Sequence, residues 1–275
     1  MPVVTLSTDI GQTDYIVGAI KGQLLSADAS NTIVDITHQL SQHNYQHTAY
    51  LCNNAFRHFP DGTFHIIIVN LFEALPKHML IAEHNNQYIA CPDNGILTTV
   101  CGVTPLNVTA IDVETPHSFG VLACTQALAT AIKKLGHTPN LQHVGRPITN
   151  IKEKYPLRST IGADWIDSQI IFIDSFENVV INVTKEEFEE QRRGRNFKII
   201  FTRDEVIDKL SENYASVAPG DKLAWFNSAG YLEIAINKGN MAGLFGLRGF
   251  SENTVKQALL HNKLLYQTVR IFFVD

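Results

Sequence analysis

Polar side chains that could bind a ligand or take part in catalysis follow the ends of several apolar segments in this 275-residue chain. The first set, Ser7–Asp14 (STDIGQTD), comes directly after the apolar segment Val3–Leu6. Open α/β sheets bind ligands at the carboxyl ends of their parallel strands. A carboxylate there can accept charge-assisted hydrogen bonds from the two hydroxyls of a ribose. Asp9 is therefore a candidate ribose ligand; the alternative is that Asp9 or Thr13 only caps the following helix.

Three further polar segments interrupt the apolar pattern. Segment 91–95 (CPDNG) is a turn signal. Segment 174–178 (DSFEN) places a carboxylate, an aromatic ring and an amide between two predicted strands. An amide can recognise the edge of a base and a ring can stack on it, whereas the simpler interpretation is a hairpin loop with one buried phenylalanine. Segment 227–235 (NSAGYLEIA) predicts a hairpin with a tight turn.

The elements that position these segments alternate between strand and helix in the first half of the chain. Short apolar or β-branched runs predict buried strands, and runs with apolar residues at helical spacing predict helices. Such alternation is typical of an α/β domain with a mostly parallel, Rossmann-like sheet covered on both faces. The predicted strands are Val3–Leu6, Thr32–Ile36, Phe64–Val69 and a hairpin of Met79–Ala82 with Gln87–Ala90, and the predicted helices are Asp14–Leu25, Gln46–Phe56 and Phe119–Leu135.

The pattern changes after the segment Gly145–Ser159, which carries two prolines and several charges and predicts a linker. Short strands then follow with little helix except Lys185–Gln191, so we expect a small all-β domain, a sandwich or a barrel. The expected domains are residues 1–155 and 160–275. The predicted strands of the second are Gln169–Ile173, Val179–Val183, Phe197–Phe201, Lys222–Asn227, Tyr231–Ile236 and Leu265–Phe273.

Composition excludes several classes of function. The net charge of −5 argues against a nucleic-acid-binding protein. No run of about 20 apolar residues and no signal peptide is found, so we expect a cytoplasmic protein without a membrane span. The four cysteines form no C-x-x-C pair and are expected to be reduced and buried. Eleven histidines lack a metal-binding spacing, and no metal is expected.

Taken together, the ordered polar segments resemble the SAM hydroxide adenosyltransferase family, which also includes fluorinase and chlorinase. The resemblance rests on the S/T-D-x-G-x-x-D start, D-I-T-H at 35–38, P-D-N-G at 92–95, D-x-F-x-N at 174–178 and N-S-x-G-Y-L-E-I-A-x-N at 227–237. It implies an N-terminal α/β domain and a C-terminal β-barrel. It further implies a homotrimer with active sites between the N-domain of one subunit and the C-domain of its neighbour. SAM would be the substrate, with no separate cofactor.

The resemblance also implies roles for individual residues. Asp9 would hold the ribose hydroxyls, and Phe176 and Asn178 would contact adenine. Asp174, Ser228 and Glu233 would face the methionine portion of SAM or its base. Ile236 would present its backbone to the ligand.

The chain departs from the family pattern around the attacking water, where hydroxide-transferring members use an Asp, an Arg and a His. Where V-D-P-G-V-G is usual, residues 69–74 are VNLFEA, so the carboxylate is replaced by Asn70. The arginine would fall near Lys77 or His78. The usual T-F-H-G-R-D is TPHSFG at residues 115–120, which retains His117.

These residues define the expected chemistry. Water would attack the ribose 5′ carbon of SAM, and methionine would leave as a neutral thioether without a general acid. A base must accept the water's proton, which an amide cannot do. His117 can, and Glu73 could supply a replacement carboxylate. We therefore expect a SAM hydrolase that forms adenosine and methionine and uses His117, Asn70 and either His78 or Lys77. The alternative is a SAM- or adenosine-binding protein without efficient catalysis; a halogenase has only Ser118 in its favour.

Overall fold

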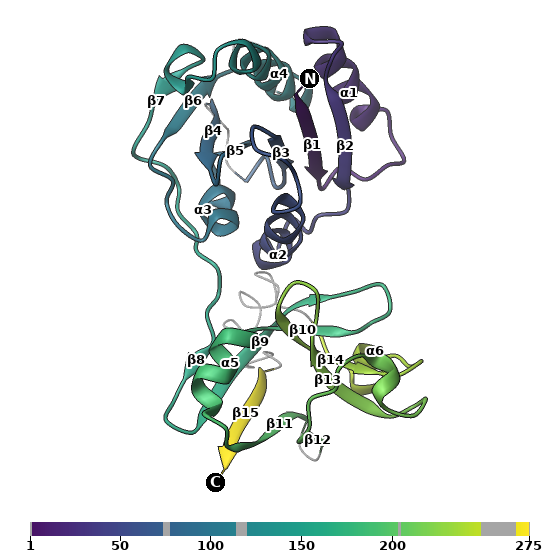
Figure 1. Cartoon of the computed structure of the whole chain (residues 1–275). Helices are drawn as coiled ribbons and strands as arrows, with labels where there is room; N and C mark the ends of the chain where they lie inside the picture. The colour runs from purple at the N-terminus through teal and green to yellow at the C-terminus, as the bar shows by residue number, and fades with distance from the viewer. Residues whose placement is uncertain (1, 74–77, 114–119, 203–204, 249–267, 275) are drawn as a thin grey trace. The chain divides into compact units, whose positions relative to one another are not determined.

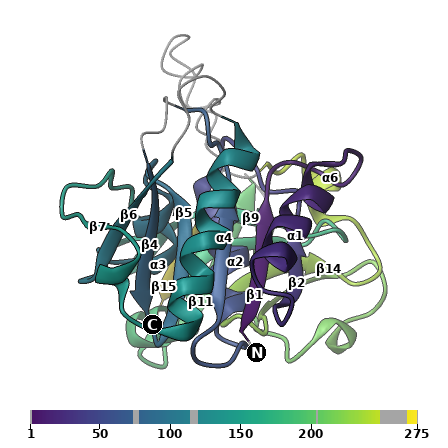
Figure 2. The ribbon, with the colours of Figure 1, turned by 90° about the horizontal axis from the view of Figure 1, so that it is seen from above.

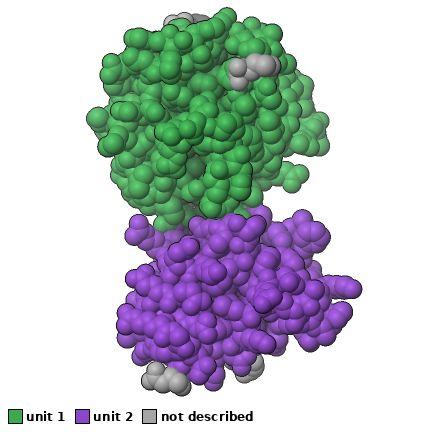
Figure 3. Space-filling view, in the orientation of Figure 1, with its two compact units in different colours: residues 1–156 green, residues 157–275 purple. Residues whose placement is uncertain are grey.

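The computed structural model describes residues 2–73, 78–113, 120–202, 205–248 and 268–274. The chain folds into two compact units, residues 1–156 and residues 157–275 (Figure 3). Each unit has its own sheet and buries its own hydrophobic residues.

The N-terminal unit is built on a seven-stranded sheet of order β2-β1-β3-β5-β4-β6-β7 (Figure 1). Strands β2, β1, β3 and β5 pair in parallel, whereas β4 is antiparallel to both of its neighbours and β7 is antiparallel to β6. The predicted mixture of helices and strands is confirmed, and the sheet itself is mixed. The strands are β1 (Val3–Thr8), β2 (Thr32–Thr37), β3 (Phe64–Ile68), β4 (His78–His84), β5 (Gln87–Pro92), β6 (Val108–Asp112) and β7 (Arg146–Pro147).

Helices cover both faces of this sheet. Helices α1 (Ile16–Ala27) and α4 (Val121–His137) lie side by side across one face, as Figure 2 shows. Helices α2 (Tyr45–Phe56) and α3 (Ile96–Cys101) pack in the core on the other face. Strand β3 is almost wholly apolar because both of its faces are buried. Ile66 and Ile68 belong to a first core, which also contains residues of α1 and α4, whereas Ile67 and the following Val69 belong to a second core, which contains residues of α2 and α3.

The hairpin between β4 and β5 confirms its turn prediction. His84 pairs with Gln87, which leaves Asn85 and Asn86 as the two loop residues. Both have positive φ angles, 51° and 59°, as a type I′ turn requires. This hairpin inserts β4 between β5 and β6 and brings the start of β4 to the carboxyl end of β5.

Three features of the N-terminal unit were not anticipated from the sequence. Strand β6 and helix α3 were not predicted, and the first part of the predicted linker packs against the unit. Ile151 is buried in the second core. The backbone N–H of Lys154 donates to Thr98 Oγ1 (2.9 Å), and its carbonyl accepts from the same hydroxyl (2.7 Å).

The C-terminal unit contains an eight-stranded antiparallel sheet with the path β12-β11-β15-β9-β10-β14-β13, and β8 pairs with β9. A bridge between Leu210, which follows β12, and Ala224 of β13 joins the two ends of this path, so the sheet is nearly a closed barrel. The strands are β8 (Thr160–Ile161), β9 (Trp165–Ile173), β10 (Val179–Thr184), β11 (Asn196–Thr202), β12 (Glu205–Ile207), β13 (Lys222–Phe226), β14 (Tyr231–Ile236) and β15 (Thr268–Val274).

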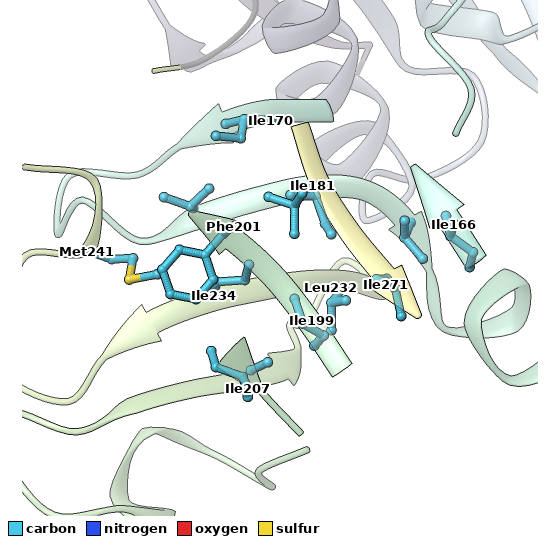
Figure 4. Packing of buried hydrophobic residues seen from close by; sticks show 14 of the residues in the cluster. Ile166, Ile170, Ile181, Ile199, Phe201, Ile207, Leu232, Ile234, Met241 and Ile271 are labelled. Carbon is cyan, nitrogen blue, oxygen red and sulfur yellow. The ribbon is translucent and has the colours of Figure 1, made fainter. Parts of the chain in front are cut away.

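Alternation along these strands supplies the core of the C-terminal unit. In Figure 4, side chains from several strands point toward one another, among them Ile199, Leu232 and Ile271, all fully buried. The predicted helix at Lys185–Gln191 is α5 (Lys185–Arg192), and a second helix, α6 (Met241–Phe245), was not predicted. In the described residues this unit is mainly β and carries the short helices α5 and α6, so the expectation of an all-β domain is corrected in this respect.

Among the described residues, no helix combines the length and the apolar character needed to cross a membrane.

Stability of the N-terminal unit should depend on the protonation of His65 in β3. This side chain is fully buried, lies 2.8 Å from Thr5 Oγ1 through Nδ1 and stacks on Phe56 at 3.7 Å. Burial lowers its pKa to about 4. Because the folded pKa lies below the unfolded value of about 6.5, the fold favours the neutral ring, and this stabilisation is lost as the pH falls from 6.5 toward 4.

We expect this histidine alone to make the protein about 2 kcal/mol less stable at pH 5 than at pH 7. Denaturant unfolding at the two pH values measures the loss. In His65→Gln, the difference between the two pH values should shrink by that amount. An equal pH dependence in both proteins would show that His65 is not the source.

Candidate active site

The carboxyl ends of β1, β3 and β5 meet at one edge of the N-terminal sheet, and a polar residue follows each strand. Asp9 follows β1, and its Oδ2 accepts a hydrogen bond from the backbone N–H of Asn70 (2.8 Å) in the segment after β3. Burial raises the pKa of Asp9, and the hydrogen bond from Asn70 opposes that rise. Asp9 does not cap α1, because Asp14 Oδ1 accepts the Ile16 N–H at the start of that helix (2.5 Å). The helix-cap alternative for Asp9 is therefore wrong.

Asn70 is the centre of this edge. Its φ of 46° lies in the left-handed region, which asparagine tolerates better than most residues. Its side-chain Nδ2 donates to Tyr45 Oη (3.3 Å). Its carbonyl accepts from Asn94 Nδ2 (3.2 Å), which also donates to the Val69 carbonyl (2.9 Å). The P-D-N-G segment is thus more than a turn, because Asn94 fixes the backbone on which Asn70 sits.

A second set of contacts extends from Asn70 through Tyr45. Tyr45 Oη donates to Glu73 Oε2 (3.2 Å), and Lys154 Nζ lies 3.2 Å from Glu73 Oε1. Lys154 comes from the segment predicted to be a linker, and sequence reasoning missed both it and Tyr45. The one signal was Gly95 in P-D-N-G: its φ is 97°, and a Cβ there would lie 2.6 Å from Lys154 Cγ. Lys77, one expected replacement for the family arginine, lies outside the described residues.

His78, the other expected replacement, lies at the start of β4 and therefore at this same edge of the sheet. Its Nε2 lies 3.2 Å from Asp93 Oδ2, and both side chains are largely buried. Asp93 Oδ1 also accepts the backbone N–H of Lys152 (2.8 Å), which fixes the carboxylate. An imidazole held by a fixed carboxylate can act as a base. His117, the predicted base, and Ser118 lie outside the described residues.

The D-I-T-H segment supports the loop that carries Asp9. His38 Nδ1 lies 3.0 Å from Thr8 Oγ1, and its Nε2 lies 3.2 Å from Asp35 Oδ1. The His38 carbonyl accepts the N–H of Gly11 (2.7 Å). The described residues contain no group of three or more His, Cys, Asp or Glu side chains placed to hold a metal ion.

In the C-terminal unit, Asp174 organises the loop between β9 and β10. Its Oδ1 accepts the backbone N–H groups of Phe176 (2.9 Å) and Asn178 (2.8 Å), and its Oδ2 accepts from Asn178 Nδ2 (3.0 Å). The Phe176 side chain is 75% exposed. The simpler prediction of a loop with a buried phenylalanine is therefore wrong, and the ring is free to contact a partner.

Glu233 in β14 is the centre of a second polar cluster in this unit. Its buried carboxylate accepts hydrogen bonds from Tyr214 Oη (2.5 Å), Trp225 Nε1 (3.0 Å) and Asn227 Nδ2 (3.1 Å). Burial and the hydrogen bond to Glu233 raise the pKa of Tyr214. Asn178 Nδ2 lies 3.4 Å from Tyr214 Oη, which joins this cluster to the Asp174 loop.

The last two predicted residues of this unit have different settings. Ser228 is exposed in the turn between β13 and β14. Ile236 buries its side chain in the barrel core, and its carbonyl accepts the N–H of Gly239 (3.0 Å). The structure therefore brings together Asp174, Asn178 and Glu233, leaves Phe176 and Ser228 exposed, and uses Ile236 in packing. Sequence reasoning missed Tyr214 and Trp225.

The two units together define a two-domain α/β protein whose N-terminal sheet gathers acidic, amide and imidazole groups where such sheets bind small molecules. The profile of the SAM hydroxide adenosyltransferase N-terminal domain matches residues 4–144, and that of the C-terminal domain matches residues 168–253. The chain belongs to the SAM hydroxide adenosyltransferase family.

Individual relatives agree with this assignment. The chain is 26% identical over 198 residues to an (R)-S-adenosyl-L-methionine hydrolase of Methanocaldococcus jannaschii, covering 68% of this chain and 69% of that protein. It is 24% identical over 285 residues to a fluorinase of Actinopolyspora mzabensis, covering 90% and 94%. The crystal structure of an uncharacterized conserved protein from Thermotoga maritima superimposes with a TM-score of 0.79 at 20% identity, covering 98% and 99% of the two chains. That last similarity establishes the fold.

Proposed function

We propose that this protein cleaves S-adenosylmethionine with water at the ribose 5′ carbon, which yields adenosine and L-methionine. The observation that carries the proposal is Asp9, a half-buried carboxylate at the ends of the parallel strands, held by the N–H of Asn70. Membership of the family and the similarity to proteins named (R)-SAM hydrolase indicate the substrate and the reaction.

The proposed binding roles follow the chemistry of each group. One Asp9 oxygen is held by Asn70, and the carboxylate retains lone pairs for the ribose hydroxyls. The exposed Phe176 ring offers a stacking surface for adenine. Asn178 donates through Nδ2 to Asp174, and its Oδ1 accepts no hydrogen bond from the described residues, so it can accept one from the exocyclic amine of adenine.

The remaining binding residues are proposed from the family resemblance. Glu233 and Ser228 would face the methionine portion or the base, with the backbone of Ile236 beside them. The proposed assembly is a homotrimer, and the substrate needs no additional cofactor.

The chemical step requires a base but no acid. As water attacks C5′, the C5′–S bond breaks and sulfur takes its electron pair into a neutral thioether. The Asn70 amide can hold water but cannot take its proton. His78, fixed by Asp93, has the chemistry of a base at this edge, and His117 is the second proposed base.

The second candidate function is a protein that binds SAM or adenosine without efficient turnover. The replacement of the family carboxylate by Asn70 favours it specifically, because general-base assistance typically contributes about 10²–10⁴-fold to a rate. Because the chain is also similar to a fluorinase, the assay described below also tests for transfer of a halide ion.

Asp9→Asn should weaken adenosine binding by more than about tenfold without unfolding the protein. A charge-assisted hydrogen bond contributes roughly 1.5–3 kcal/mol, and the amide oxygen of the variant can still accept the Asn70 N–H. Titration calorimetry measures the affinity. Asp61→Asn, a matched change in the exposed turn before β3, serves as the control and should bind like the wild type. Unchanged affinity in Asp9→Asn would remove Asp9 from the ribose site.

Wild-type protein incubated with SAM should form adenosine and methionine slowly, and Asn70→Asp should raise that rate at least about tenfold by restoring a carboxylate base. Chromatography in the presence and absence of chloride and fluoride distinguishes hydrolysis from halide transfer. Asn85→Asp, at another left-handed asparagine on the exposed hairpin, is the control and should leave the rate unchanged. SAM that is bound but never cleaved, by the wild type or by Asn70→Asp, would establish the binding protein instead.

A further inference from the structure

A hydrogen-bonded chain of three side chains, from Tyr45, Glu73 and Lys154, determines which end of the Asn70 amide faces Tyr45. Asn70 Nδ2 lies 3.3 Å from Tyr45 Oη, Tyr45 Oη lies 3.2 Å from Glu73 Oε2, and Lys154 Nζ lies 3.2 Å and 3.4 Å from the two Glu73 oxygens. Tyr45 and Lys154 have no assigned role in the family chemistry described above.

The direction of each hydrogen bond in this chain follows from donor and acceptor capacity. A carboxylate paired with a lysine can only accept. The single hydroxyl proton of Tyr45 is therefore directed to Glu73, and the Tyr45 oxygen can only accept from Asn70. An amide has one donating end and one accepting end, so Nδ2 must face Tyr45 and Oδ1 must face the other way.

The outward end of the amide is available. Within the described residues Asn70 Oδ1 accepts no hydrogen bond, and the backbone N–H of the same residue is bound to Asp9. The free amide oxygen is therefore on Asn70, the same residue whose backbone N–H contacts Asp9, the proposed ribose ligand.

We infer that Tyr45 and Glu73, supported by Lys154, are positioning residues that orient Asn70 so that its Oδ1 accepts a hydrogen bond from the attacking water. This inference rests on the proposed function. The amide holds one proton of the water and leaves an oxygen lone pair for C5′. The water's other proton goes to the proposed imidazole base as the C5′–S bond breaks and sulfur takes the electron pair.

Further contacts hold Tyr45 and the backbone of Lys154 in place. The Tyr45 side chain is 2% exposed, and Lys154 Nζ lies 4.2 Å from the centre of its ring, a cation–π contact. Tyr45 begins α2, whose N-cap Asn44 accepts the N–H of His47 (3.0 Å). The backbone of Lys154 is bound on both sides to the Thr98 hydroxyl.

The test is Glu73→Gln, which keeps the shape of the side chain but allows it to donate. A donating Gln at position 73 can bond to the Tyr45 oxygen, release the Tyr45 proton toward Asn70 and turn the amide so that Nδ2 faces the water. We expect kcat to fall about tenfold with KM within about twofold of the wild type. A wrongly oriented Asn70 amide would slow the attack of water without weakening substrate binding. Glu83→Gln, at an exposed position near the end of β4, is the matched control and should change neither parameter.

The same substitution in an Asn70→Asp background separates positioning from a structural role. Both oxygens of a carboxylate accept, so no orientation can be wrong, and Tyr45 becomes free to donate to it. Glu73→Gln should then cause no loss of kcat. An equal loss in both backgrounds would overturn the inference.

A measurement on ligand-free protein keeps this inference distinct from the proposed function. Nuclear Overhauser contacts between the Asn70 Nδ2 protons and the Tyr45 ring should be present in the wild type and lost in Glu73→Gln. If they are absent in the wild type, the orientation is wrong whether or not SAM is cleaved. If they behave as expected but SAM is never cleaved, the orientation stands and the proposed function fails.

Discussion

The hydrogen bond from the Asn70 N–H to the Asp9 carboxylate is the interaction on which the candidate site depends. It joins the end of β1 to the segment after β3, so the two groups with the greatest chemical significance share one rigid edge of the sheet. Its donor is backbone, which means that the contact survives a change of side chain at position 70. An amide can therefore stand at position 70 while the Asp9 carboxylate keeps its place.

Around this bond the N-terminal unit supplies support from elements far apart in sequence. Asn94 after β5 holds the backbone of Asn70, Tyr45 at the start of α2 holds its amide, and the hairpin β4–β5 delivers His78 to the same edge. The C-terminal unit follows a similar rule: the carboxylates of Asp174, in a loop, and Glu233, in β14, each accept several hydrogen bonds. In both units a carboxylate that is at least half-buried accepts hydrogen bonds from neutral donors.

The sequence predicted the parts of this arrangement that follow from periodicity and local turn chemistry. Strand β3, with both faces buried, and the hairpin at Asn85–Asn86 are examples. It could not predict Tyr45 or Lys154, since their contacts join positions 28 and 81 residues away from Glu73. The segment around Lys154 carries charges and prolines typical of a linker, and its ties to the unit are hydrogen bonds to residues distant in sequence, such as Thr98 and Asp93. The exposure of Phe176 was equally hidden, because aromatic residues in short loops are usually buried.

The central claim is that water attacks the 5′ carbon of the SAM ribose. Turnover in ¹⁸O-labelled water, followed by mass spectrometry of the nucleoside product, tests this claim directly. Attack by water on C5′ predicts adenosine that carries the heavy oxygen at its 5′ position, with methionine as the other product. Unlabelled adenosine, or a nucleoside that retains sulfur because a different C–S bond was broken, would contradict it.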